Sequence, residues 1–273
     1  MADDVLLYTS DMSWAARRKF FILFTIGGVV AAFVAIVFIV TLYKAPSCAD
    51  STQNQGEVGI DCGGPCPYLC VANEQPPTVL FTQSFTDTTT GRTAVVASVE
   101  NKNMTAAAKN VPYRMTLYGA NQTLIQSVSG TLDLPPGAKT TVFIPSITSG
   151  KQRVTNSFLD IDAASVKWVA MTSDPRVVPG VSNTVQGGTV DTPRVDATLV
   201  NGTPKALTNV RVVVLVRDAH LNVIAISGTV LPTIPAQGSA VATFTWNVPF
   251  NGTPASIEVD PIIPLPDQQA GLP

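Results

Sequence analysis

The chain has 273 residues, a formal net charge of −2 and only 13% charged residues, against 45% hydrophobic ones. Soluble proteins carry about twice that share of charged residues, so the composition indicates a membrane-inserted part. The near-neutral balance argues against nucleic acid as a partner, and a single histidine argues against most nucleophile–base and histidine–metal chemistry. The length allows one or two ordinary domains. We therefore expect a membrane-tethered protein that is not an enzyme.

The first predicted element is a transmembrane helix over residues 20–43, a run without a charged residue. A helix of that length spans about 36 Å, enough to cross roughly 30 Å of hydrocarbon with some tilt. The run is longer than the apolar core of a secretory signal peptide and lacks a good cleavage site, so we expect an uncleaved signal-anchor. Three basic residues precede it: Arg17, Arg18 and Lys19. The positive-inside rule then places residues 1–19 in the cytoplasm and residues 44–273 outside the cell membrane.

Small residues recur at helical spacing within the span: Gly27, Gly28, Ala31, Ala32 and Ala35. Such a face lets two membrane helices approach closely, so a homo-oligomer through this helix is one prediction. Gly and Ala are also frequent in membrane helices generally, which is the simpler interpretation. The lipid bilayer is the partner that the span itself predicts.

All four cysteines lie in the next segment, residues 44–77: Cys48, Cys62, Cys66 and Cys70. An even number in an exported segment predicts two disulfides in a short stalk, and spacing cannot choose among the three connectivities. A zinc site is the alternative, because four thiolates can hold that metal. Exported thiols tend to oxidise, which favours the disulfides.

The same segment offers four oxygen ligands suited to Ca²⁺: Asp50, Asn54, Glu57 and Asp61. Their spacing does not match the EF-hand loop, and acidic residues in a loop of this kind are usually just solvated. Calcium is therefore the less favoured interpretation, and otherwise no cofactor or metal is expected.

The pattern C-x-D…N-x-G-E-x-G-x-D-C-G-G-x-C…C over residues 48–70 resembles a short Cys-rich motif of many bacterial and archaeal surface proteins. In those proteins the motif often lies beside a membrane anchor or Ig-like repeats. The resemblance implies a location outside the cell rather than an activity.

From residue 78 onward, short runs rich in Val, Thr, Ile and Phe alternate with turn residues, and no long helical period appears. The pattern predicts a mainly β fold of antiparallel β-sandwiches. Internal similarity at an offset of about 100 residues predicts two tandem copies, over 78–172 and 173–264. A Pro-rich tail, 265–273, is expected to be disordered.

Two matches between the copies are Val99-Glu100-Asn101 with Leu199-Val200-Asn201 and Asn110-Val111 with Asn209-Val210. We also match Phe143 with Phe244 and Ala164-Ser165-Val166 with Ala255-Ser256-Ile257. The separation between the copies is smaller at this last match than at the others, which predicts an extra loop in the first copy around residues 148–156.

The central strands differ between the copies. Val111, Tyr113, Met115 and Leu117 alternate with mostly polar residues and predict one buried face, whereas residues 210–216 are apolar on both sides at their centre. The second strand is therefore expected to be covered on each face, partly by the neighbouring domain.

The order of strands and turns resembles bacterial Ig-like modules of the FxLyD type, which are similar to fibronectin III-like sandwiches. The motif positions are Met115-Thr116-Leu117-Tyr118-Gly119 and Val214-Leu215-Val216-Arg217-Asp218; neither copy has the Phe, and each keeps part of the Tyr-Asp end. The resemblance implies extracytoplasmic binding or spacer domains, with no catalytic residues to carry over.

Little else suggests chemistry. His220 lies in a predicted hairpin without a nearby nucleophile, and two carboxylate pairs, Asp160/Asp162 and Glu258/Asp260, are expected on solvated strand faces rather than in a glycosidase-like site. Four N-x-T sequons, at Asn103, Asn121, Asn201 and Asn251, would mark exposed loops if glycosylated.

The sequence thus predicts a single-pass cell-surface protein with a structural or adhesive role and an unknown protein or glycan ligand. The alternative is an accessory subunit of a cell-envelope, pilus or secretion complex, which docks through its β-domains or its membrane helix.

Overall fold

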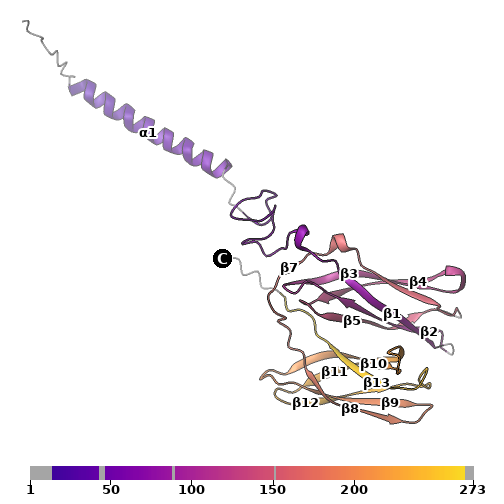
Figure 1. Ribbon diagram of the computed structural model, residues 1–273. Helices are drawn as coiled ribbons and strands as arrows, with labels where there is room; N and C mark the ends of the chain where they lie inside the picture. Colours follow the sequence, from indigo (N-terminus) through magenta and orange to yellow (C-terminus); the bar gives the residue numbers. More distant parts are fainter. Residues whose placement is uncertain (1–13, 43–46, 88–89, 151, 268–273) are drawn as a thin grey trace, which may run out of the picture.

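The computed structural model describes residues 14–42, 47–87, 90–150 and 152–267. It shows an N-terminal helix, a short disulfide-linked segment and two β-sandwiches (Figure 1). The predicted mainly β fold with one apolar helix and antiparallel sheets is confirmed.

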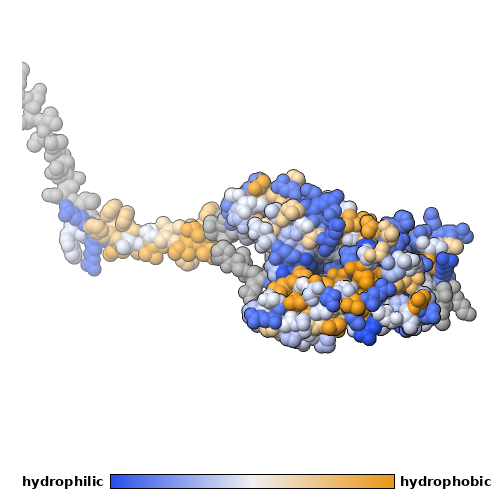
Figure 2. All heavy atoms as spheres, turned by 60° about the horizontal axis from the view of Figure 1, so that its bottom comes forward, coloured by the Kyte–Doolittle hydropathy of each residue, from blue (hydrophilic) through white to orange (hydrophobic). Residues whose placement is uncertain are grey.

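Helix α1 runs from Trp14 to Leu42, and its side chains are exposed where the structure describes them. The stretch Arg17–Thr41 is long and apolar enough to cross a membrane. Because lipid offers no hydrogen bonds, such a segment must satisfy its backbone internally, which a helix does. Even its hydroxyls bond within the helix, as Thr41 shows by donating to the Val37 carbonyl at 2.7 Å. In Figure 2 the helix is a largely orange rod beside the mixed surface of the β-domains.

The first sandwich pairs two antiparallel sheets. One has the order β1-β2-β5, with strands Thr78–Asp87, Arg92–Glu100 and Lys139–Thr148. The other has the order β4-β3-β6, with β7 paired to the start of β3; its strands are Leu124–Leu134, Ala106–Tyr118, Asn156–Asp160 and Val169–Ala170. Short 3₁₀ helices are η1 (Val71–Asn73), η2 (Ala120–Gln122) and η3 (Ala163–Ser165).

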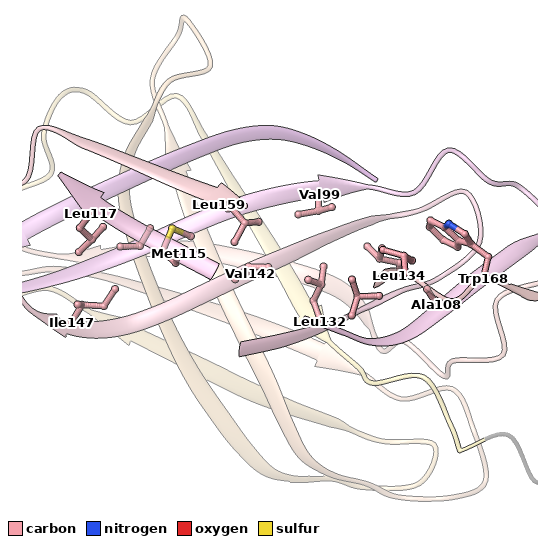
Figure 3. Packing of buried hydrophobic residues seen from close by; sticks show 14 of the residues in the cluster. Val99, Ala108, Met115, Leu117, Leu132, Leu134, Val142, Ile147, Leu159 and Trp168 are labelled. Carbon is pink, nitrogen blue, oxygen red and sulfur yellow. The ribbon is translucent and has the colours of Figure 1, made fainter. Parts of the chain in front are cut away.

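The core of the first sandwich follows the predicted alternation. Val111, Met115 and Leu117 are buried, and Tyr113 is half-buried between them. Side chains from the two sheets meet in a layer that Trp168 closes at one end (Figure 3). Period-2 alternation places one face of each strand in this layer and the other outside it.

The second sandwich has the sheet orders β12-β9-β8 and β11-β10-β13. Its strands are β8 (Gly180–Gly188), β9 (Pro193–Val200), β10 (Leu207–Arg217), β11 (Val223–Ile234), β12 (Ser239–Thr245) and β13 (Ser256–Ile262). Phe244 and Ile234 are among the fully buried side chains of its core.

The two sandwiches pack side by side, so that their sheets form four layers (Figure 1). On β10, Val212 and Val214 lie in the core of the second sandwich, whereas Val213 and Leu215 pack against the first one beside Val96 of β2. The prediction that this strand is covered on both faces is confirmed. Gly228 makes room for the contact, since a Cβ there would lie 2.4 Å from the Phe143 ring.

Each sandwich has a buried asparagine at one corner, Asn101 after β2 and Asn201 after β9, and each is 1% exposed. Each side-chain amide donates hydrogen bonds to main-chain carbonyls across the corner. The acceptors include Ala106 and Pro135 for Asn101, and Lys205 and Pro235 for Asn201. The matched asparagines thus have the same structural role.

The structure corrects the matching near the ends of the two halves. β6 pairs with β3 so that Asn156 lies opposite Tyr118, and β13 pairs with β10 so that Ser256 lies opposite Arg217. β6 is therefore the counterpart of β13. The match of Ala164–Val166 with Ala255–Ile257 is wrong, and the extra loop that it required is not needed.

The match of Phe143 with Phe244 is also wrong, by one residue. Phe143 packs in the contact between the sandwiches, whereas Phe244 lies in the core of its own sandwich. A shift of one residue along a strand exchanges its two faces, so a pattern of aromatic residues alone does not fix the register.

The tail is ordered further than predicted. Leu265 is 3% exposed, and its backbone N–H donates to the Asp133 carboxylate at 2.7 Å. Asp267 pairs with Lys109 at 2.5 Å. Residues 263–267 therefore bind the second sandwich to the first, and the rest of the predicted tail lies outside the described residues.

Candidate functional site

The small residues of α1 are exposed, and a Cβ added at Gly27 or Gly28 would meet nothing within 4 Å. The helix face that they form is thus uncovered by the described part of this chain. Self-association through it stays a prediction.

The cysteines form two disulfides, Cys48–Cys66 and Cys62–Cys70. This confirms the disulfide prediction and selects one of the three connectivities. Zinc binding requires thiolates, which these bonded sulfurs no longer provide.

The glycines of the Cys-rich motif are explained by close packing. Gly63 and Gly64 have φ values of +67° and +61°, a conformation that side chains rarely adopt. A Cβ on Gly64 would lie 2.3 Å from the Gly56 carbonyl oxygen, and one on Gly59 would lie 2.8 Å from the Cys62 sulfur. The motif therefore encodes a tight fold that two short disulfide loops hold together.

The acidic residues of the motif bond to its own backbone. Asp61 accepts N–H bonds from Asp50 and Ser51 at 3.0 Å each. Asp50 accepts from the Thr52 N–H at 2.9 Å, and buried Glu57 accepts from the Asp61 N–H at 3.2 Å. These carboxylates satisfy donors that a loop without regular secondary structure leaves unpaired.

The four residues predicted for calcium lie in this loop, with the Asn54 Oδ1 atom buried and without a hydrogen-bond partner. Among the described residues, the oxygens of Asp50, Glu57 and Asp61 do not form a group within 4.8 Å of one another. Such a group is formed by Glu57 with Cys48 and Cys66, whose sulfurs are bonded to each other. Calcium binding stays a prediction, and the structure does not assemble its ligands.

The Cys-rich segment is attached to the first sandwich rather than extended from it. The Leu69 N–H donates to the Trp168 carbonyl at 3.0 Å, and the Ala170 N–H donates to Pro67 at 2.6 Å. Leu69 also packs against the core. The predicted stalk is therefore joined to the β-sheet through β7.

A groove of about 320 Å³ lies between the two sandwiches, and Asp260 is one of its lining residues. Burial raises the pKa of the Asp260 carboxyl, which accepts a hydrogen bond from the Thr141 side chain. The prediction that this aspartate lies on a solvated strand face is wrong, because the neighbouring sandwich covers it. Glu258, in contrast, is exposed and pairs with Arg217 at 2.9 Å.

The other chemical candidates lie on the surface. The His220 side chain is 86% exposed in the β10–β11 hairpin. Asp160 is exposed on β6, and Asp162 accepts from the Ala164 N–H at the start of η3. Of the sequon asparagines, Asn103 and Asn201 are buried.

A second groove, of about 540 Å³, lies on the outer face of the first sandwich. It is formed by Arg114, Thr116, Tyr118, Gln122, Asn156, Phe158 and Asp160. The Phe158 side chain is 58% exposed, and its ring meets that of Tyr118 edge to face at 5.8 Å. We call this the aromatic groove. It is suited to a ligand, because an exposed ring lies beside a half-buried one among hydrogen-bonding groups.

The outer face of the second sandwich differs. There Arg194 donates to Asp196 at 3.0 Å, and the Thr243 hydroxyl donates to the same carboxylate at 2.6 Å. These hydrogen bonds, the one from Thr243 first, lower the pKa of Asp196.

The sequence contained a signal for the aromatic groove that its interpretation did not use. Along each of β3 and β6, residues that alternate with the core residues point outward, and these include Tyr118 and Phe158. An aromatic residue at a position that alternation places outside is the kind of exposed residue that binding surfaces use.

No family model matches the chain, and no curated protein matches it. Among solved structures, the chain is similar to the transglutaminase of red sea bream, with 9% sequence identity and a TM-score of 0.23. The match covers 68% of this chain and 29% of that one, so this chain spans a minor part of its length. So low a score carries no argument about fold or activity.

Proposed function

We propose that the chain is a single-pass membrane protein whose N-terminus lies in the cytoplasm and whose two sandwiches lie outside the cell membrane. Its role there is structural or adhesive, with a protein or glycan as the ligand. Two features support the orientation: the basic residues Arg17, Arg18 and Lys19 before the apolar run, and the disulfides that follow it.

The observation that carries the proposal is the pair of disulfides within residues 48–70, a few residues after α1. Disulfides persist in oxidising compartments and are rare in the cytosol. A chain in which two disulfides hold the segment that follows an apolar helix fits a location on the outer side of the membrane.

We further propose that the sandwiches are Ig-like copies of one ancestral unit. The equivalent corners at Asn101 and Asn201 support this, as do the left-handed residues Asn110 and Asn209, with φ values of 54° and 53°. The equivalent pairing of β6 and β13 agrees with it.

The packing bears on how such a protein would act. Because the inner faces bury each other, the two sandwiches form one block, and its outer faces and loops are the surfaces left for a ligand. The proposed role is therefore to hold a rigid binding surface close to the membrane.

Labelling of intact cells with a membrane-impermeant amine reagent tests the orientation. The exposed lysines Lys102 and Lys205 are expected to react, whereas Lys19 is not. Labelling of Lys102 and Lys205 only after permeabilisation would contradict the proposal. A matched variant with Arg17, Arg18 and Lys19 changed to Glu is expected to increase the inverted fraction.

A second candidate is an accessory subunit of a cell-envelope, pilus or secretion complex. The uncovered face of α1 at Gly27, Gly28 and Ala31 favours it, since small residues allow another membrane helix to approach. Gly27→Leu should then abolish co-purification of the complex from membranes, while Val40→Leu in the same helix should not. Equal recovery with both variants argues against docking through this face.

We also propose that the protein is not an enzyme. Among the described residues, His220 and Asp160 lie on the surface, and the Asp260 carboxyl between the sandwiches accepts a hydrogen bond from the Thr141 side chain.

A further inference from the structure

The aromatic groove follows the outer side of two paired strands. Along β3, Met115 and Leu117 point into the core, so Thr116 and Tyr118 point outward. On β6, Leu159 is buried and Phe158 is outside. Strand pairing places Thr116 opposite Phe158, which brings outward groups from residues far apart in the sequence together.

The two rings give the groove an apolar centre. Phe158 is 58% exposed, and the rings of Phe158 and Tyr118 are inclined at 71°. The edge of an aromatic ring is positive and its face is negative, so an edge-to-face pair leaves ring surface that can contact C–H groups of a ligand.

Three polar side chains around the rings have no hydrogen-bond or ion-pair partner among the residues that the structure describes. Within the described part of the chain, no hydrogen bond or ion pair engages the side chains of Arg114, Asn156 or Asp160. Arg114 and Asp160 lie opposite each other across the strands. The groove therefore offers both hydrogen-bond donors and hydrogen-bond acceptors, and its positive and negative side chains nearly balance in charge.

We propose that the aromatic groove binds a neutral saccharide, an inference that rests on the proposed binding role of the sandwiches. Sugar rings present C–H groups on their faces and hydroxyls at their edges, which complements aromatic rings bordered by guanidinium, amide and carboxylate groups. The balance of Arg114 with Asp160 favours a neutral sugar over an acidic one.

The size of the groove favours a small ligand over a protein partner. Its volume of about 540 Å³ is in the usual range of small-molecule sites, roughly 300–1,000 Å³. A stable protein partner would need about 800 Å² of surface with an apolar centre. The groove is lined by seven residues, of which Tyr118 and Phe158 are the aromatic ones, so its apolar centre is too small for such an interface.

The test uses the full chain in lipid nanodiscs, which avoids glycoside detergents that would compete. The probes are soluble hexasaccharides of glucose, mannose and N-acetylglucosamine, with polygalacturonate as an acidic comparison. At least one neutral hexasaccharide is expected to bind, and Phe158→Ala is expected to weaken it at least about tenfold.

Two further variants sharpen the result. Phe158→Leu keeps apolar bulk but removes the ring, and it should weaken binding nearly as much as Phe158→Ala. Val241→Ala, at a 55% exposed position of the second sandwich, should leave affinity unchanged. Thermal unfolding of each variant should match the wild type, because Phe158 is outside the core.

Three results would overturn the inference: no binding of any neutral probe, preference for polygalacturonate, or equal affinity of the wild type and Phe158→Ala. Binding in nanodiscs does not depend on the side of the membrane. Failure of cell-surface labelling with saccharide binding retained would remove the proposed location and leave the site. Correct cell-surface labelling without saccharide binding would leave the proposed location and remove the saccharide site.

Discussion

The two outer faces of the block come from non-equivalent sheets of the two sandwiches, β4-β3-β6 of the first and β12-β9-β8 of the second, and they differ in how their polar groups are used. On the second sandwich, Arg194 and Thr243 both donate to Asp196. On the first, Arg114 and Asp160 lie opposite each other without such bonds, beside the exposed ring of Phe158. One face satisfies its own polar groups, and the other leaves them available.

The inner faces show the opposite tendency. Val96 from the first sandwich and Val213 and Leu215 from the second are buried together in one apolar cluster. A surface of this kind serves stability, because apolar burial is favourable and non-directional. The comparison therefore separates the faces that hold the block together from an outer face whose polar groups are available to a ligand.

The largest expected effect comes from a charge in the inner contact. Leu215→Asp should lower the free energy of unfolding by about 3 kcal/mol or more, because Leu215 is 2% exposed and the new carboxylate would lack a partner. Urea denaturation of the chain measures it. Val241→Asp, on an outer face, is the matched control and should cost about 0.5 kcal/mol or less. Similar costs for both variants would show that the sandwiches do not pack as described.

The corner asparagines should come next. Asn101→Ala and Asn201→Ala each remove a buried donor that bonds several main-chain carbonyls, so each should cost about 1–3 kcal/mol. Denaturation of the two single variants checks this. Comparable losses are expected if the sandwiches are copies of one unit, and a silent substitution at either site would argue against equivalent corners.

A smaller effect is expected at the outer faces. Asp196→Ala should cost about 0.2–1 kcal/mol, as partly exposed ion pairs do, whereas Asp160→Ala should leave stability unchanged. The Asp196 contribution is complete above the ordinary pKa of 3.8 and disappears as pH falls through the lowered value in the folded chain. The free energy of unfolding of the wild type and of both variants is measured from pH 7 to pH 2. An equal cost at Asp160 would remove the contrast between the faces.

The smallest effect concerns Asp260. Burial raises its pKa, so its charged form destabilises the folded chain at neutral pH. Stability should rise as pH falls through the raised pKa towards 3.8, since the folded state takes up the proton first. Asp260→Asn keeps an acceptor for Thr141 and should raise the unfolding temperature slightly at pH 7, with the gain vanishing near pH 4. A gain that is the same at both pH values would contradict this cause.

Much of the architecture was predictable because local patterns dictate it. An uncharged run gives a membrane-length helix, and alternation in residues 111–117 fixes which side chains of β3 enter the core. The apolar character of Val212 to Leu215 even indicated a neighbour on the second face.

The rest depended on register and on contacts between distant segments. The match of Phe143 with Phe244 failed by one residue, since neither periodicity nor composition distinguishes the two faces of an apolar strand. Burial of Asp260 and of Leu265 follows from how one sandwich lies on the other, which no local pattern specifies.

The candidate site was predictable only in part. The even number of cysteines and their exported location predicted the disulfides, but which cysteines pair could be known only from the fold of the loop. Prediction of the aromatic groove required knowing that β3 pairs with β6. This pairing places Tyr118 opposite Asn156, two residues before Phe158.

The most direct test of the account is the state of the four cysteines in the chain taken from cells. Free thiols are trapped by alkylation before lysis, and peptides are then mapped without reduction. The account predicts no alkylated cysteine and two linked peptide pairs, Cys48 with Cys66 and Cys62 with Cys70. Alkylation of all four would contradict an oxidised Cys-rich segment outside the cell membrane, and with it the proposed function.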